Sequence, residues 1–134
     1  MVCDEEGYLL VIGIDIIEIE RIKQAVLRTP RFLNRLYTVG ELDYCRSKSN
    51  PYPSLAARFA AKEAVRKLHP SLSRGIGFRD VEVVVEAGGR PRIVLHGAAL
   101  VRCEEAGIRN IDLSLSHSAT HAIAAVIAEE ELRG

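Results

Sequence analysis

Apolar residues along the chain follow two spacings, one typical of strands and one typical of helices. Residues 8–14 form a short continuous run rich in Leu, Val and Ile, which predicts a buried strand. From residue 15 to about residue 28 the apolar side chains recur every three or four positions, which predicts an amphipathic helix. Thr38 and Glu41 have the spacing of a capping box, so a short helix is expected from there to about residue 45.

The rest of the chain predicts further helices and strands in short succession. Ser54 can cap a helix over residues 55–68, which Pro70 ends. Alternating apolar positions and glycine turns predict the remaining elements: strands over residues 81–86, 92–95, 111–116 and 121–128, and a helix over residues 98–106. The order β-α-α-α-β-β-α-β-β predicts an α+β fold in which a small antiparallel sheet packs with helices.

Composition fits a single small domain over residues 1–134, with residues 1–7 expected to be a flexible leader. The chain has 134 residues, of which 48% are hydrophobic, and this excludes an acidic disordered chain. Its 18 basic and 18 acidic side chains give a net charge of zero, which argues against a general nucleic-acid partner. Three widely spaced cysteines, an acidic start and short apolar runs predict reduced thiols, a cytoplasmic location and no membrane span.

The charges are unevenly placed along the chain. Residues 1–20 contain six acidic side chains and no basic one, whereas residues 21–36 contain five basic side chains and no acidic one. A charge run is usually a solvated helix face. The alternative interpretation is a docking surface for an acidic partner.

Asp15 stands where the predicted strand gives way to the predicted helix. Asp15 and Glu18 have the spacing of a capping box, so Asp15 can be the N-cap of that helix. A carboxylate at a strand end can instead bind a cation. Local sequence leaves both interpretations open.

The predicted helix over residues 55–68 carries several charged side chains beside a face of small residues. Five positions between 56 and 64 are Ala, which predicts that another element packs very close. Glu63 and Lys67 lie at the margin of that face, as an exposed ion pair or as half-buried groups. Three cations form a stripe that is either solvated or occupied by a polyanion: Arg58, Lys62 and Arg66. One Asp, one Glu and nearby cations suit Mg²⁺-dependent phosphate chemistry.

The remaining polar motifs give weaker signals. His117 and His121 are expected around a hairpin, so they do not predict a metal pair; His117 can bind phosphate, move a proton or be an ordinary surface side chain. Ser114 and Ser116 lack the Gly-x-Ser-x-Gly setting of a serine hydrolase. Neither a Walker A sequence nor a Gly-x-Gly-x-x-Gly fingerprint is present.

Four segments together resemble those of holo-acyl-carrier-protein synthases. They are VIGIDIIEIERI at residues 11–22, RFAAKEAVRK at 58–67, GRP at 89–91 and IDLSLSHS at 111–118. They occur in the family's order, and the resemblance extends from about residue 10 to residue 129. It implies a 4'-phosphopantetheinyl transferase fold made of one unit.

The resemblance also implies a reaction. Enzymes of this kind transfer the 4'-phosphopantetheine group from coenzyme A to a serine of apo acyl carrier protein. The transfer requires Mg²⁺, releases adenosine 3',5'-bisphosphate and activates the carrier for fatty acid biosynthesis. Family members of this short type are homotrimers with active sites between subunits.

Residue by residue, the family's roles fall on named positions of this chain. The metal-binding carboxylates fall on Asp15 and Glu63, and the catalytic groups on Glu63 and Lys67. The positions that line the coenzyme A site are Arg58, Lys67, Arg90 and His117. The positions that receive the acidic carrier protein are Arg21, Arg28 and Arg31.

Two departures and several alternatives accompany the resemblance. His69 to Ser71 stand where the family often has a Gly-rich turn, and Arg90 replaces the commoner Lys.

The alternatives are a broad-range transferase for peptidyl or polyketide carrier domains, a non-catalytic module that binds an acidic protein, and an oligomeric scaffold. The base that deprotonates the serine stays open between a metal-oriented water, Glu63 and another carboxylate.

Overall fold

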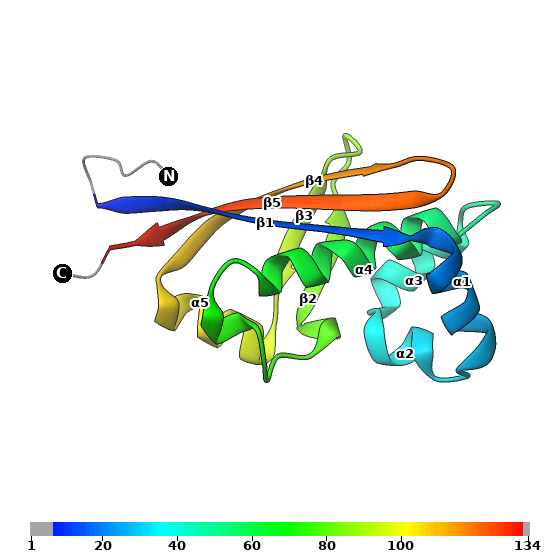
Figure 1. The fold of residues 1–134 in the computed structure, drawn as a ribbon, viewed down its shortest axis with the longest axis horizontal. Helices are drawn as coiled ribbons and strands as arrows, with labels where there is room; N and C mark the ends of the chain where they lie inside the picture. The colour runs from blue at the N-terminus through cyan, green and yellow to red at the C-terminus, as the bar shows by residue number, and fades with distance from the viewer. Residues whose placement is uncertain (1–6, 133–134) are drawn as a thin grey trace.

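The computed structural model describes residues 7–132, in which the first strand is longer than the apolar run predicted (Figure 1). Strand β1 spans Tyr8–Glu18, and helix α1 begins only at Ile19 and runs over Ile19–Arg28. The prediction that a helix starts at Asp15 is therefore wrong. Strand β1 pairs with strand β5 over its whole length, so partner hydrogen bonds hold residues 15–18 in the sheet.

The strands form two antiparallel sheets. The larger has the order β1-β5-β4, with β4 at Ile108–His117 and β5 at His121–Glu131. The smaller pairs β2, Val81–Val85, with β3, Pro91–Leu95. The predicted strands are all confirmed. Strand β4 begins earlier than predicted and β5 ends later than predicted, and these two extensions pair with each other.

Helix α4, Tyr52–Arg66, crosses one face of the larger sheet and forms the centre of the core (Figure 1). Its alanines are buried, and at Gly13 an added Cβ would lie 1.9 Å from the Ala64 carbonyl oxygen. The close packing that the Ala pattern predicted is confirmed. The helix starts at Tyr52 with Pro51 as N-cap, so the predicted Ser54 cap is wrong, because Ser54 lies inside the first turn.

Two helices contact α4: α1 and α3, the latter at Val39–Arg46. A third, α2 at Phe32–Leu36, which the sequence pattern missed, contacts α1 and η2 and joins the same apolar cluster. The capping box of Thr38 and Glu41 is confirmed. Two short 3₁₀ turns, η1 at Pro70–Leu72 and η2 at Phe78–Asp80, follow α4, and α5 spans Gly97–Ala106.

The α+β class is confirmed, with one more helix than predicted. Over residues 7–132, no helix is long and apolar enough to cross a membrane. Residues 1–6 of the predicted leader lie outside the described residues, and the Gly7 carbonyl accepts a hydrogen bond from the Leu132 amide.

The outer face of the larger sheet carries exposed isoleucines. Ile12, Ile14 and Ile16 alternate along β1 with exposures of 52–61%, and Ile123 and Ile127 lie on the neighbouring β5. A cavity of about 270 Å³ on this face is lined by Ile12 and Ile127 among others. Contiguous exposed apolar surface of this kind is typical of a protein–protein interface.

Candidate functional site

Asp15 lies in β1 two positions after Gly13, which packs closely on Ala64 of α4. The Lys67 ammonium, just after α4, is 3.0 Å from Asp15 Oδ1 and donates to the Ile14 carbonyl at 2.8 Å. The predicted capping role of Asp15 is wrong, because the N-cap of α1 is Glu18 and its side chain makes no capping hydrogen bond. Lys67 pairs with Asp15 rather than with Glu63.

Glu63 lies on α4 one turn before Lys67 and is half-buried. Among the described residues its side chain has no hydrogen-bond or ion-pair partner. The next residue, Ala64, contacts Gly13, two positions before Asp15. The fold therefore brings the two predicted carboxylates onto neighbouring elements that pack directly against each other.

This pair of carboxylates fits a Mg²⁺ ion better than a metal held wholly by protein. No group of three or more His, Cys, Asp or Glu side chains within residues 7–132 is placed to hold a metal. Mg²⁺ usually takes one or two carboxylates and completes its octahedron with water and phosphate oxygens. Asp15 and Glu63 supply that number, and among the described residues Glu63 has no cation already paired with it.

A cavity of about 250 Å³ forms around Arg58 on the other side of α4. It lies between α3, α4, the β2–β3 hairpin and the end of β4, and its lining includes Tyr44, Ser54, Gly89, Ser116 and His117. Arg58 is 3% exposed, donates to the Ser54 carbonyl at 3.2 Å and stacks 4.3 Å from the Tyr44 ring centroid. Within the described part of the chain, its Nε is buried without a hydrogen-bond partner. A buried guanidinium with an unused donor favours an anionic ligand.

Arg90 lies outside that cavity, although its neighbours Gly89 and Pro91 line it. Its guanidinium is exposed and lies 2.9 and 3.0 Å from the two carboxylate oxygens of Asp112. Their hydrogen bond raises the pKa of Arg90 and lowers the pKa of Asp112. Arg90 would have to leave this partner to reach a ligand in the cavity.

The two groups of predicted residues lie on opposite sides of α4. Arg58 and Lys67 are nine positions apart, which is about two and a half turns and about 14 Å along a helix axis. Arg58 contacts elements beside β4, whereas Lys67 contacts β1, and β1 and β4 are the two edges of the sheet. Within one chain, the carboxylates and the Arg58 cavity therefore do not face each other.

Lys62 is neither solvated nor placed to bind a polyanion, so both interpretations of the cationic stripe are wrong at this position. It is fully buried and paired with Glu41 at 2.8 Å. Burial lowers the pKa of Lys62, while the Glu41 carboxylate acts in the opposite direction. Sequence reasoning missed this pair, although Lys62 follows the buried Leu55 by seven positions and therefore shares its helix face. Arg66 donates to the Ile76 carbonyl at 2.8 Å.

A hydrogen-bonded chain continues from Glu41 towards the surface. The Thr38 hydroxyl accepts from the Glu41 amide and donates to Glu82 Oε2 at 2.6 Å. His96 Nε2 lies 2.9 Å from the other Glu82 oxygen. Burial by itself raises the pKa of Glu82, but the hydrogen bonds to Thr38 and His96 outweigh it, so the pKa is lowered.

The turn after α4 closes without the glycines of the family pattern. His69 Nδ1 accepts a hydrogen bond from the Ser71 amide at 3.1 Å and caps η1. Its imidazole thus holds the local backbone at the position where the family often has a Gly-rich turn.

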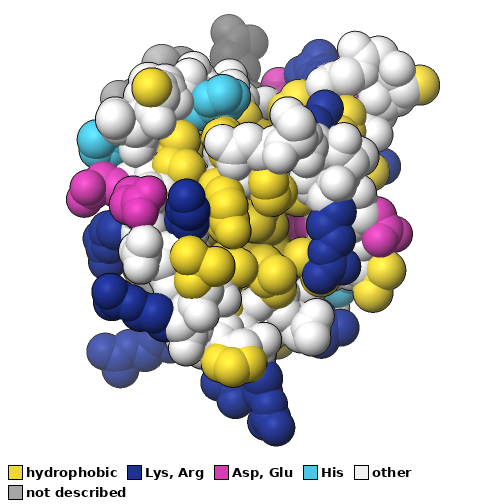
Figure 2. All heavy atoms as spheres, turned by 90° about the vertical axis from the view of Figure 1, so that its right-hand side faces the viewer, with side chains coloured by type: hydrophobic (Ala, Val, Ile, Leu, Met, Phe, Trp, Pro, Cys, Tyr) yellow, Lys and Arg dark blue, Asp and Glu magenta, His cyan; other side chains and the backbone are white. Residues whose placement is uncertain are grey.

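The predicted docking arginines are exposed at the helical end of the molecule. Arg21 and Arg28 line a groove of about 440 Å³ along α1, and Arg31 is exposed just before α2. Figure 2 shows this end, with Lys and Arg side chains gathered around a central apolar hollow.

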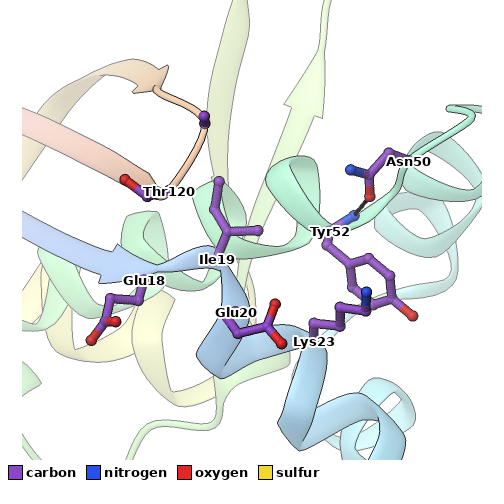
Figure 3. Close-up of a pocket in the computed structure, with 8 residues that line it drawn as sticks. Glu18, Ile19, Glu20, Lys23, Asn50, Tyr52 and Thr120 are labelled. Atoms are coloured by element: carbon purple, nitrogen blue, oxygen red, sulfur yellow. Dashed lines mark hydrogen bonds between the residues drawn. The ribbon is translucent and has the colours of Figure 1, made fainter.

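A second pocket at this end holds none of the predicted metal or coenzyme A residues. It has a volume of about 410 Å³ and lies between α1, the start of α4 and the β4–β5 turn. In Figure 3, Glu20 and Lys23 of α1 lie beside Tyr52, with Lys23 Nζ 5.6 Å from the ring centroid. Residues predicted for the site lie instead around the smaller Arg58 cavity and at the Asp15–Lys67 contact.

Comparison with known proteins defines the class. The family model described as the 4'-phosphopantetheinyl transferase superfamily matches residues 11–126. A holo-[acyl-carrier-protein] synthase of Moorella thermoacetica is 47% identical over 123 residues, covering 90% of this chain and 92% of that protein.

Solved structures agree with this match. A holo-[acyl-carrier-protein] synthase from Neisseria meningitidis superposes with a TM-score of 0.75 at 34% identity, covering 90% of this chain and 98% of that one. One from Helicobacter pylori in complex with coenzyme A gives 0.72 at 33% identity, covering 87% and 98%. The chain belongs to the 4'-phosphopantetheinyl transferase superfamily, as an enzyme of the holo-[acyl-carrier-protein] synthase type. The resemblance seen in the sequence is confirmed.

Proposed function

We propose that this enzyme transfers the 4'-phosphopantetheine group from coenzyme A to a serine of apo acyl carrier protein, with Mg²⁺ bound. Adenosine 3',5'-bisphosphate is the second product. The observation that supports the proposal is the contact between β1 and α4 in a member of this family: Lys67 pairs with Asp15, and Ala64, the residue after Glu63, packs on Gly13. The solved relative with coenzyme A bound supports the choice of donor.

Asp15 and Glu63 would hold the Mg²⁺ ion. When bound, the ion supplies Lewis-acid stabilisation of charge on the pyrophosphate. Lys67 adds a positive charge beside Asp15, where it stabilises the phosphate oxygens as the serine hydroxyl gives its proton to a base, its oxygen bonds to the β-phosphorus and the bond to the leaving bisphosphate breaks. Arg58 and His117 bind a phosphate of coenzyme A in the cavity that they line.

A second copy of the chain completes the site. One chain leaves the carboxylates and the Arg58 cavity on opposite sides of α4, so coenzyme A can contact both only if two copies face each other. The exposed isoleucines of β1 and β5 supply an apolar surface for that association. These two features support a site shared between copies of the chain, and the number of three copies is the one that the family implies.

The basic surface of α1 receives the carrier protein. Arg21 and Arg28 line one groove, whose other lining residues include Glu18 and Glu20, and Arg31 adds positive charge towards α2. An acidic protein would be attracted to this surface and oriented by it before transfer.

Incubation with coenzyme A, Mg²⁺ and an apo acyl carrier protein, followed by mass spectrometry of the carrier, tests the proposed reaction. A gain of one phosphopantetheine is expected. Modification of peptidyl or polyketide carrier domains in preference to the fatty acid carrier would favour a broad-range enzyme. Tight carrier binding without a mass gain would contradict transfer.

Two variants test the metal-binding assignment. Asp15→Asn and Glu63→Gln should each lower Mg²⁺-dependent kcat by about 100-fold or more, because each removes a charged ligand of the ion that stabilises the reacting phosphates. Their melting temperatures should stay close to wild type. Glu131→Gln, exposed at the end of β5 far from His117 and Asp15, is the matched control and should retain full activity. Near-wild-type turnover in either site variant would contradict the assignment.

A further inference from the structure

Helix α4 is joined to its neighbours by a fully buried ion pair. Lys62 Nζ donates to Glu41 Oε1 at 2.8 Å, and both side chains are 0% exposed. The ammonium also donates to the Phe78 carbonyl at 3.1 Å and to the Val81 carbonyl. All three of its protons therefore have acceptors, which fixes its position relative to η2 and β2.

The Glu41 carboxylate holds two further elements. Its Oε1 accepts from the Thr38 amide at 3.0 Å, which closes the capping box of α3. Its Oε2 accepts from the Val83 amide at 2.9 Å, in β2. One carboxylate thus sets the relative placement of α3, α4 and β2.

These three elements are also the walls of the Arg58 cavity. Tyr44 comes from α3, Val85 from the end of β2, and Arg58 from α4 one turn before Lys62. The Arg58 guanidinium stacks on Tyr44, so a shift of α3 against α4 would move the charge that the cavity presents.

We propose that Lys62 and Glu41 are positioning residues, which aim Arg58 at a phosphate of coenzyme A without touching the substrate. This inference rests on the proposed function, since it takes coenzyme A as the ligand of the cavity. A buried ion pair adds little net stability compared with well-packed apolar side chains, whereas its directional hydrogen bonds define one geometry. The pair therefore serves the placement of Arg58 more than the stability of the core.

The variant Lys62→Met/Glu41→Gln removes both charges together. The amide side chain introduced at position 41 keeps one oxygen, which can accept from either the Thr38 or the Val83 amide, and no charge is left buried and unpaired. The KM for coenzyme A should rise about ten- to a hundredfold, the effect of losing one charge-assisted hydrogen bond. The KM for the carrier protein should change less than twofold, because α1 lies outside the cavity.

Ile108→Ala is the control for stability alone. Ile108 is buried at the start of β4, at the opposite end of that strand from His117 and in a core cluster that contains no residue of α3, and its truncation should lower the melting temperature. A loss of folded enzyme lowers the apparent kcat and leaves both KM values unchanged. If the double variant behaves like this control, the pair has only a structural role and the proposal is wrong.

A milder variant covers the case in which the double variant does not fold. Glu41→Asp keeps the charge and withdraws the carboxylate by about 1.5 Å, one carbon–carbon bond. It too should raise the KM for coenzyme A and leave the KM for the carrier unchanged; an unchanged KM for coenzyme A overturns the proposal. Wild-type enzyme that fails to modify the carrier contradicts the proposed function instead, so the two failures are distinguishable.

Discussion

Gly13 controls the distance between β1 and α4, so its substitution tests the architecture of the site. A Cβ at this position would lie 1.9 Å from the Ala64 carbonyl oxygen and 3.1 Å from Val126 Cγ2. Carbon–oxygen contacts are normally about 3.3–3.6 Å, so in Gly13→Ala the helix must retreat by about 1.5 Å. Both flanking surfaces belong to the core, which leaves no open space to absorb the shift.

The cost of this retreat can be worked out from packing. Overpacking a core by one methyl group typically costs about 1–3 kcal/mol. For 134 residues, the usual unfolding entropy converts this into a loss of about 4–11 °C in melting temperature. The contacts of Lys67 with Asp15 and Ile14, at 3.0 and 2.8 Å, cross the same gap and would break. A misplacement of about 1 Å can lower kcat about 100-fold.

Thermal unfolding by circular dichroism and carrier modification by mass spectrometry measure the two effects. Gly88→Ala is the matched control, because an added Cβ there meets no described atom within 4 Å and the backbone is not left-handed. The reasoning is refuted if Gly13→Ala melts within about 2 °C of Gly88→Ala, a difference of about 0.5 kcal/mol, and retains its kcat.

Three further predictions concern the surface and pH. Arg21→Glu should raise the KM for the carrier about tenfold or more and leave the KM for coenzyme A unchanged, whereas Arg92→Glu on β3 should alter neither; equal effects on both substrates would contradict docking. Ile14→Glu should sediment as a smaller species and lose transfer, unlike Leu100→Glu on α5; an assembled, active Ile14 variant would refute the shared site. Hydrogen bonds to its threonine and histidine partners lower the pKa of Glu82. The ionised Glu82 carboxylate therefore stabilises the folded state above about pH 4.3, and this stabilisation is lost as the pH falls through the lowered pKa of Glu82. Glu82→Gln should accordingly lose less melting temperature between about pH 6 and about pH 3 than wild type, and an equal loss would show that Glu82 does not contribute.

Local sequence was sufficient wherever neighbouring residues decide the structure. The capping box of Thr38 and Glu41, the glycine turn between β2 and β3 and the Ala face of α4 all depend on contacts within a few positions. The helix α2 is only five residues long, too short to show a helical period, and it was missed.

The site residues were predicted by resemblance to a family, and the fold supplied their arrangement. Nothing in the local sequence distinguishes Asp15 as a helix cap from Asp15 as a strand residue. Pairing of β1 with β5 settles this, because hydrogen bonds from a strand more than 100 positions away outweigh the local helical spacing.

By itself, the sequence determined the α+β class, most element types and the family whose residues Asp15, Glu63 and Lys67 match. The tertiary structure alone decided that Lys67 pairs with Asp15, that Lys62 is buried against Glu41, and that the carboxylates and the Arg58 cavity face opposite sides of one helix. The physical reason is that burial and ion pairing depend on elements distant in the chain, whereas capping, turns and helical periodicity depend on neighbours.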